Sequence, residues 1–433
     1  MTENKEQMYQ SNKEHHHEHN ILSRREVLMR FGAAGAVILG ANIPGLNAFS
    51  QTKGALSSRP RPDMGPKNEG AALAETFTGI TTDGKVIPDL FPIVSTGVST
   101  KPVRVAAEKF IASLTDAQRS ATVFEVVDEE WRKWNNVDMY QRQGVCLKEM
   151  DEGQKKAAFD LLGAALSAKG LRLARNIMKL NTTEGELLNQ INRFNEHLYW
   201  FSIMGIPSDS APWGFQLDGH HLIINYFILS DQVVMSPVFL GSEPPVATTG
   251  IHRGISVLQD EQNEGLAMIN ALNVEQQSRA IVQTGKTGNN LVAGAFKDNL
   301  IVDYIGVRAL ALTSAQQTRL LDLIALWIYN LRDAHARIKM DEIRKYLPDT
   351  YFGWVGGIDE EAVFYYRIQS PVILIEFDHE LPGPLRQVQP STVPTRNHIH
   401  AMMRTPNGND YGKALLREHL LSHPHHLEGD GHK

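Results

Sequence analysis

The stretch WGFQLDGHHLIINYFILSDQVVMSPVFL occupies residues 213–240 and is rich in β-branched and aromatic side chains. Such a composition is typical of strands, and the Ser230-Asp231 pair in its middle is typical of a turn. A second stretch of this kind lies near the end of the chain. The expected strands are 215–217, 221–229 and 233–240 in the first group, and 363–368, 371–378 and 398–403 in the second.

Apolar residues with helical spacing occur on either side of the first strand group, over 158–180 and over 320–331. Residues three and four positions apart lie on one face of a helix, so both stretches are expected to form amphipathic helices. Strands gathered between helical blocks favour an α+β fold over an alternating βαβ fold. The prediction is one large α+β domain, with helical blocks flanking mainly antiparallel strand clusters.

Four of the expected helices begin in the same way. Each has a short polar residue, a Gln three positions later, and an apolar residue just before the polar one. The polar side chain and the Gln side chain each satisfy a backbone N–H that the helix leaves free. An ancient duplication would explain the repeat, although independent use of a favourable helix start is the preferred interpretation. The four starts are Thr115, Asp151, Asn273 and Thr313.

Composition excludes several classes of site. The net charge is −6, and the first 50 residues carry as many acidic as basic side chains, so no basic surface for nucleic acid is expected. Cys146 is the only cysteine, which excludes an internal disulfide and a zinc site built from several thiolates. The chain also lacks a G-x-S-x-G hydrolase elbow, an H-E-x-x-H zinc motif and an EF-hand loop.

The N-terminus resembles an export signal. Ser23-Arg24-Arg25-Glu26-Val27-Leu28 is a twin-arginine signature, and the apolar run over 31–43 is shorter than the ~20 residues that span a bilayer. Recognition by the twin-arginine translocase and a periplasmic or otherwise extracytoplasmic location are therefore expected, with no stable membrane span. An uncleaved amphipathic terminus is the alternative. The expected organisation is a signal peptide over 1–50, a linker over 51–70, one domain over 71–420 and a His-rich tail over 421–433.

Histidines outside the two His-rich ends indicate a metal site. His398 and His400 alternate along an expected strand, so both rings point to the same face, about 7 Å apart. Two such rings can reach one ion, because Zn–N bonds are ~2.0–2.1 Å long. His220 and His221 would face opposite ways in a regular strand, and a bulge at Gly219 would re-aim one of them.

Carboxylates near the end of another expected strand extend this pattern. Glu376 and Asp378 follow apolar residues, and buried carboxylates need a partner, either a cation or Arg. The three motifs together predict one shared metal site. The alternative is that these histidines only hydrogen-bond to loops. The expected ligands are His220, His221, Glu376, Asp378, His398 and His400.

A loop rich in Pro, Gly and Asn follows the strand with His398 and His400. Arg404 at its start either holds an anionic substrate or pairs with the carboxylate of Asp410. Arg404 and Asp410 are therefore the candidate catalytic residues.

The sequence also resembles the bacterial domain of unknown function 3500 family. The resemblance covers about residues 103–420 and implies one continuous domain, but it carries no established activity. The residues that carry it are Leu114-Thr115-Asp116-Ala117-Gln118-Arg119, Pro212 to His221, Tyr365-Tyr366-Arg367-Ile368, Ile375-Glu376-Phe377-Asp378, Asn397-His398-Ile399-His400, Arg404 and Asp410-Tyr411-Gly412.

The functional hypothesis is an extracytoplasmic metal-dependent enzyme, hydrolytic or oxidative, that acts on a small molecule. Histidines with one carboxylate suit Zn²⁺ or Fe²⁺, with Cu and Mn as further possibilities. A non-catalytic metal-binding or ligand-binding envelope protein is the main alternative. A structural protein whose histidines join strands is the third interpretation. An open coordination position beside a pocket favours the enzyme, and a closed shell of four ligands favours binding.

Overall fold

The computed structural model describes residues 69–423, which belong to one compact unit. The predicted signal peptide, nearly all of the predicted linker and most of the His-rich tail lie outside the described residues. The described α-helices are α3 (Glu69–Ala74), α4 (Lys101–Ser113), α5 (Asp116–Thr122), α6 (Glu152–Ala165), α7 (Ala168–Leu188), α8 (Gln259–Asn270), α9 (Val274–Ala280), α10 (Ser314–Ile328), α11 (Asp333–Lys345) and α12 (Lys413–Ser422).

One sheet of twelve strands runs through these residues. The strands are β1 (Val123–Phe124), β2 (Val145–Cys146), β3 (Tyr199–Met204), β4 (Trp213–Gly219), β5 (Leu222–Leu229), β6 (Gln232–Ser242), β7 (Ile281–Gln283), β8 (Val307–Arg308), β9 (Tyr351–Gly356), β10 (Phe364–Gln369), β11 (Leu374–His379) and β12 (Ile399–Arg404). Their order is β1-β3-β4-β5-β6-β12-β11-β10-β9-β7, with β2 beside β3 and β8 beside β9. Only the β1–β3 and β7–β9 pairs are parallel. The predicted α+β fold is confirmed, and the two predicted strand groups join through β6 and β12.

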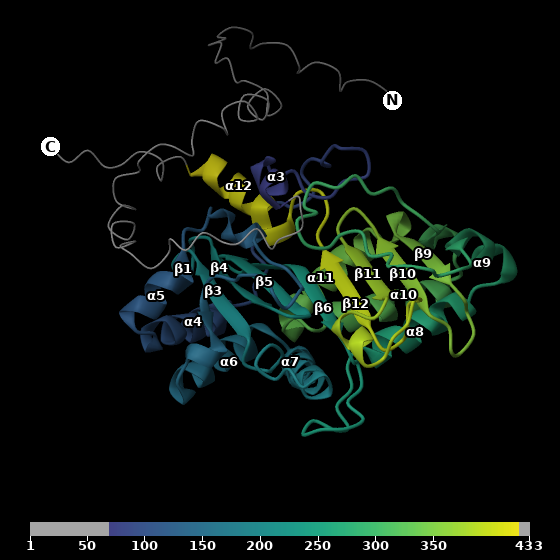
Figure 1. The fold of residues 1–433 in the computed structure, drawn as a ribbon. Helices are drawn as coiled ribbons and strands as arrows, with labels where there is room; N and C mark the ends of the chain where they lie inside the picture. The colour runs from purple at the N-terminus through teal and green to yellow at the C-terminus, as the bar shows by residue number, and fades with distance from the viewer. Residues whose placement is uncertain (1–68, 424–433) are drawn as a thin grey trace, which may run out of the picture. The chain divides into compact units, whose positions relative to one another are not determined.

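The sheet separates two hydrophobic cores. Successive strand residues point to opposite faces, so that Ala401 belongs to one core and Met402 to the other. The larger core contains the buried sides of α4, α6, α7, α8, α10 and α11. The smaller core contains Trp131, Trp134 and Tyr411, together with residues of α12 (Figure 1). Side chains on this second face therefore meet loops and α12 instead of the long helices.

The two halves of the described chain repeat one succession of elements. Two helices, two short strands, two further helices and four sheet strands run from α4 to β6, and the same series runs from α8 to β12. Because β6 and β12 are antiparallel neighbours at the centre of the sheet, an approximate two-fold axis between them relates the halves (Figure 1).

The four similar helix starts occupy equivalent places in these halves. Gln118 at the start of α5 and Gln154 at the start of α6 are joined by a side-chain hydrogen bond of 2.8 Å. Gln276 of α9 and Gln316 of α10 are joined in the same way, at 2.8 Å. Both pairs therefore link equivalent helices through the same side-chain type. This arrangement supports the duplication that the sequence alone left as the less favoured interpretation.

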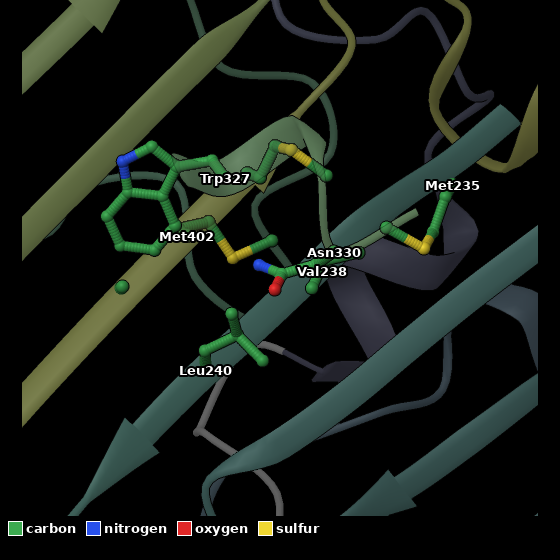
Figure 2. Close-up of a pocket in the computed structure, with 8 residues that line it drawn as sticks. Met235, Val238, Leu240, Trp327, Asn330 and Met402 are labelled. Atoms are coloured by element: carbon green, nitrogen blue, oxygen red, sulfur yellow. The ribbon is translucent and has the colours of Figure 1, made fainter. Parts of the chain in front are cut away.

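A small cavity lies beside the two-fold axis (Figure 2). Its volume of about 10 Å³ corresponds to about one water molecule. The lining is mainly apolar and consists of Met235, Val238, Leu240, Trp327, Asn330, Ala401, Met402 and Met403. Within residues 69–423, no helix is both long enough and apolar enough to cross a bilayer.

Candidate metal centre

His221 reaches the centre from a tight turn. Gly219 pairs with Leu222, so His220 and His221 form the two-residue connection between β4 and β5. The φ angle of His221 is 61°, in the left-handed region where histidine is several-fold enriched among residues other than glycine. The strand expected from residue 221 therefore begins at Leu222. The turn, instead of a bulge at Gly219, directs the His221 ring.

His400 lies in β12 and His398 lies just before it, with one residue between them. Gly241 of β6 is the strand partner of His400. A Cβ atom placed on Gly241 would lie 3.0 Å from Cδ2 of His221 and 3.1 Å from Cδ2 of His400. The imidazole rings therefore use space that is free because this position is glycine.

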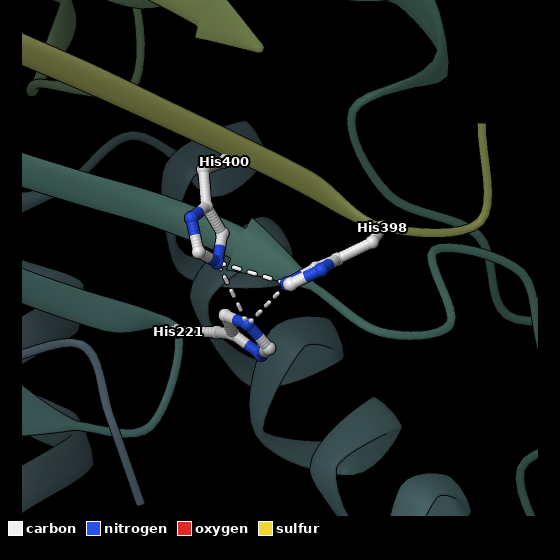
Figure 3. A group of neighbouring side chains, drawn as sticks. All are labelled: His221, His398 and His400. Atoms are coloured by element: carbon white, nitrogen blue, oxygen red, sulfur yellow. Dashed lines mark hydrogen bonds between the residues drawn. The ribbon is translucent and has the colours of Figure 1, made fainter. Parts of the chain in front are cut away.

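The Nε2 atoms of the three histidines converge (Figure 3). The distance between these atoms is 3.3 Å for His221 and His398, 3.1 Å for His221 and His400, and 3.0 Å for His398 and His400. The three residues are 4%, 5% and 8% exposed, respectively. His398 and His400 were predicted as ligands from their alternation on a strand. His221 was predicted from its place after Gly219 and His220.

The outer nitrogens of two rings have oxygen partners. His400 Nδ1 lies 2.9 Å from Glu380 Oε2, and His398 Nδ1 lies 2.6 Å from the carbonyl oxygen of Leu381. Carboxylate and carbonyl oxygens only accept hydrogen bonds, so both Nδ1 atoms carry a proton. Burial and the neighbouring His400 lower the pKa of His398 to about 3, and burial lowers the pKa of His221 well below its usual value. The Nε2 atoms of His398 and His400 therefore face each other, and each offers a lone pair when its ring carries only the Nδ1 proton.

Glu243 supports the loop that carries Leu381. Its carboxylate accepts the backbone N–H groups of Gly383 and Leu385 at 2.9 and 3.2 Å. Burial raises the pKa of Glu243, and these two hydrogen bonds oppose the rise. Glu243 Oε1 is 3.9 Å from His398 Nδ1, which is beyond hydrogen-bonding distance, so Leu381 is the partner that fixes the ring.

His220 takes a different position from the converging histidines. Its ring stacks on that of His221 with 3.9 Å between centroids, and its Nδ1 lies 2.9 Å from Asn181 Oδ1. The same Nδ1 is 3.4 Å from Glu184 Oε2. Because the amide oxygen of Asn181 accepts its proton, this nitrogen has no lone pair for an ion. His220 therefore supports the His221 ring from one side.

Glu376 and Asp378 bind a loop instead of joining the three histidines. The backbone N–H groups of residues 290 and 291 donate to Asp378 Oδ2 at 2.6 and 3.0 Å, and those of residues 292 and 293 donate to Glu376 at 3.0 and 2.9 Å. Lys286 Nζ lies 2.7 Å from Asp378 Oδ1, and the Tyr365 hydroxyl donates to Glu376. The cation that the buried carboxylates need is therefore supplied by Lys286 of the chain itself.

Arg404 and Asp410 lie in a closed ion network. Nη1 of Arg404 is 2.8 Å from Asp298 Oδ1 and 3.1 Å from Asp410 Oδ2, and the same guanidinium donates to the carbonyl oxygens of residues 293 and 294. Arg404 and Asp410 are both fully buried. Of the two roles considered for Arg404, the contacts agree with pairing to Asp410, and they leave the guanidinium no free edge for a substrate.

Several residues around the histidines were not singled out in the sequence. Glu380 lies two residues after the expected Asp378 and is the only one with a local signal, its place at the end of a strand. Glu184, Glu243 and Gly241 carry none, because each lies more than 100 residues from His398 in sequence. His379 instead accepts the backbone N–H of residue 364 at 3.0 Å and contacts Gln262.

Comparison with known proteins gives a family but no function. A family model described as "Protein of unknown function (DUF3500)" matches residues 96–413, which is well over half of the chain. No curated protein and no solved structure matches the chain. The match covers every residue of the three-histidine group.

Proposed function

The chain belongs to the DUF3500 family, whose description names no reaction, and from its own residues we propose that it is a metal-dependent enzyme. The ion binds to Nε2 of His221, His398 and His400. The favoured ion is Zn²⁺ and the favoured chemistry is hydrolytic.

One observation carries this proposal. The Nε2 atoms of His398 and His400 are 3.0 Å apart, and both Nδ1 atoms are held by oxygen acceptors. Two facing lone pairs at this distance repel each other unless a metal ion or a shared proton lies between them. The third nitrogen, Nε2 of His221, favours a metal ion, because one proton joins only two nitrogens. Zn–N bonds of 2.0–2.1 Å at the tetrahedral angle place two ligand nitrogens about 3.3 Å apart. The three observed separations, 3.0 to 3.3 Å, are close to that value.

The type of ligand favours zinc over iron. Non-haem Fe²⁺ oxygenases use two histidines and one carboxylate, whereas the nearest carboxylate here, Glu380, contacts an outer nitrogen. Three neutral imidazoles suit Zn²⁺ and also Cu²⁺. Carboxylates and carbonyl groups on the outer nitrogens are the usual second partners of metal-binding histidines. Glu380 and Leu381 provide this type of support.

Three protein ligands favour catalysis over a purely structural role. Structural zinc sites have four protein ligands, and catalytic ones have three and a free position. When bound in such a site, Zn²⁺ supplies a hydroxide near neutral pH and polarises a substrate oxygen. His400 is the most exposed of the three residues, at 8%.

A non-catalytic metal-binding protein is the second candidate. The observation in its favour is burial, because all three histidines are less than one-tenth exposed. Exchangeability of the fourth ligand separates the two candidates. In Co²⁺-substituted protein, added azide should change the visible absorption spectrum of an enzyme with a free coordination position. An unchanged spectrum at saturating azide would indicate a closed site and would contradict the enzyme.

Metal content tests the site itself. Untagged protein truncated after residue 422, which removes the His-rich tail, should contain about one equivalent of metal per chain. His398→Ala and His400→Ala should each lose that metal, and a chelator should lower the melting temperature of the wild type but not of either variant. A site-bound ion at ~1,000 times its Kd contributes about 4 kcal/mol to stability.

His335→Ala is the matched control, because His335 is a buried histidine on α11 that contacts the carbonyl oxygen of Asp231. It should keep its metal even if its melting temperature falls. The proposal is contradicted if the wild type is purified without bound metal. It is also contradicted if His398→Ala and His400→Ala both keep their full metal content.

Export completes the proposed function. The twin-arginine signature at Arg24 and Arg25 supports an extracytoplasmic location, and this route carries proteins that have already folded. The metal site joins residues about 180 positions apart in sequence, so it exists only in the folded chain. A folded chain that carries its ion through the translocase fits both features.

A further inference from the structure

Glu184 is the one carboxylate near the histidines without a hydrogen bond. It lies in α7, is 0% exposed, and both of its oxygens lack a hydrogen-bond partner within residues 69–423. A buried carboxylate in this state loses its hydration without compensation, which is costly unless a charge nearby balances it. One of its oxygens, a ring nitrogen of His220 and a ring nitrogen of His221 all lie within 4.8 Å of one another.

The surrounding backbone fixes where Glu184 points. Asn181 Nδ2 donates to the carbonyl oxygen of Asn195, and the hydroxyl of Thr182 accepts the backbone N–H of Glu196. A Cβ on Gly185 would lie 2.2 Å from the carbonyl oxygen of Phe194, so α7 approaches the segment 194–196 as closely as glycine allows. These three contacts hold the turn of α7 that carries Glu184.

His221 needs an outer partner of the kind that the other two histidines have. Its Nε2 is directed at His398 and His400, which leaves Nδ1 as its outer nitrogen (Figure 3). Glu380 and the Leu381 carbonyl oxygen already serve His400 and His398. The His220 ring stacks on that of His221 with 3.9 Å between centroids, and His220 Nδ1 lies 3.4 Å from Glu184 Oε2, so Glu184 reaches His221 through His220.

We propose that Glu184 is a positioning residue of the metal centre, which holds the His220 ring against His221 and balances part of the charge of a divalent ion. The inference rests on the proposed metal site. Burial raises the pKa of Glu184 well above its usual value, and a divalent ion nearby favours the ionised form, so that Glu184 and Glu380 together match the two positive charges of the ion. Glu243 is not part of this balance, because its carboxylate accepts two backbone N–H groups. The centre therefore prefers divalent ions to monovalent Cu⁺.

Glu184→Gln tests the inference because it keeps the shape of the side chain and removes its charge. In the full-length chain, Zn²⁺ affinity measured by competition with a chelating dye should fall about 10- to 100-fold. Cu⁺ affinity, measured in the same way under reducing conditions, should fall less. The melting temperature of the metal-free variant should be unchanged or higher than that of the wild type, since a buried carboxylate without a partner has been removed.

Glu261→Gln is the matched control, because Glu261 is a buried carboxylate on α8 that pairs with Lys169. It should leave both metal affinities unchanged. Glu184→Asp, which keeps the charge, should retain more of the preference for Zn²⁺ over Cu⁺ than Glu184→Gln does.

The outcomes separate the two proposals. A wild type that binds no Zn²⁺ overturns the metal site and this inference together. A wild type that binds Zn²⁺, with equal Zn²⁺ affinity in Glu184→Gln, overturns the inference alone. Equal losses of Zn²⁺ and Cu⁺ affinity together with a lower metal-free melting temperature would show that Glu184 only supports the fold.

Discussion

The absence of a side chain at Gly241 leaves the space that the His221 and His400 rings occupy. It faces His400 across the β6–β12 pair, and a side chain there would contact both His400 and His221. The backbone at this point also approaches the carbonyl oxygen of Ile399, 2.8 Å from the position of a Cβ. A methyl group at position 241 therefore requires the His221 and His400 rings to shift by a few tenths of an ångström.

Gly241→Ala should consequently displace His221 and His400 and weaken metal binding, although it removes no ligand. The overpacking cost is about 1–3 kcal/mol, which a large domain tolerates. Metal content and the melting temperature with and without chelator provide the measurement. Gly285→Ala is the control, because a Cβ there meets no atom within 4 Å. Normal metal affinity in Gly241→Ala would show that the rings are not packed as described.

The period of a strand was enough to place His398 and His400 on one face, because successive strand residues alternate. The same reasoning could not identify the binding partners of Glu376 and Asp378. Their partners are four backbone N–H groups and Lys286, on a segment about 85 residues earlier with no strand or helix pattern. A buried carboxylate requires some partner, and sequence alone does not distinguish a metal ion from a lysine.

Strand β11 pairs with its neighbours in the sheet and also binds a loop through its side chains. Through Glu376 and Asp378 it binds four successive N–H groups of the segment 290–293, which covers the smaller core. Lys286 and Asp378 form an ion pair in which both side chains are fully buried. The loop is thus attached to the sheet by charges and backbone hydrogen bonds.

Asp378→Asn should destabilise the protein but leave its metal content unchanged. The substitution leaves the Lys286 ammonium buried without a countercharge, and breaking a buried pair in this way costs about 3–5 kcal/mol. Chemical denaturation gives the free energy of unfolding, and elemental analysis gives the metal content. A variant that loses its metal while remaining folded would return Asp378 to the list of ligands.

Element prediction succeeded where local signals agreed. The capping boxes at Thr115 and Thr313 both form, and the turn at Ser230-Asp231 separates β5 from β6. The expectation missed β3 and β9, of which β9 contains two glycines, a residue depleted in strands. It also missed the very short strands, because two or three residues carry no measurable period.

For the whole molecule, the approximate two-fold symmetry explains why similar helix starts recur, but the metal centre does not follow it. His221 belongs to the first half, and His398 and His400 to the second. Three-dimensional equivalence was not visible in the sequence, because the halves share element order and capping residues more than side-chain identity. The symmetric scaffold is thus predictable only in outline.

The proposed export also concerns the whole molecule. Arg24→Lys combined with Arg25→Lys should leave full-length precursor in the cytoplasm, because the translocase recognises the arginine pair. Cell fractionation and immunoblotting measure the distribution. Arg30→Lys is the matched control and should be exported normally. The twin-arginine interpretation would be contradicted if the cleaved form of the double variant were found in the periplasm.

The placement of the histidines along the chain has a consequence for biosynthesis. His221 is near the middle of the sequence, whereas His400 is close to the end of the segment matched by the family model. A chain whose synthesis stops before residue 398 lacks two of the three imidazoles and cannot form the centre. Under the proposed function, retention of the ion would therefore mark a folded chain that extends past residue 400, and shorter products would fail to retain it.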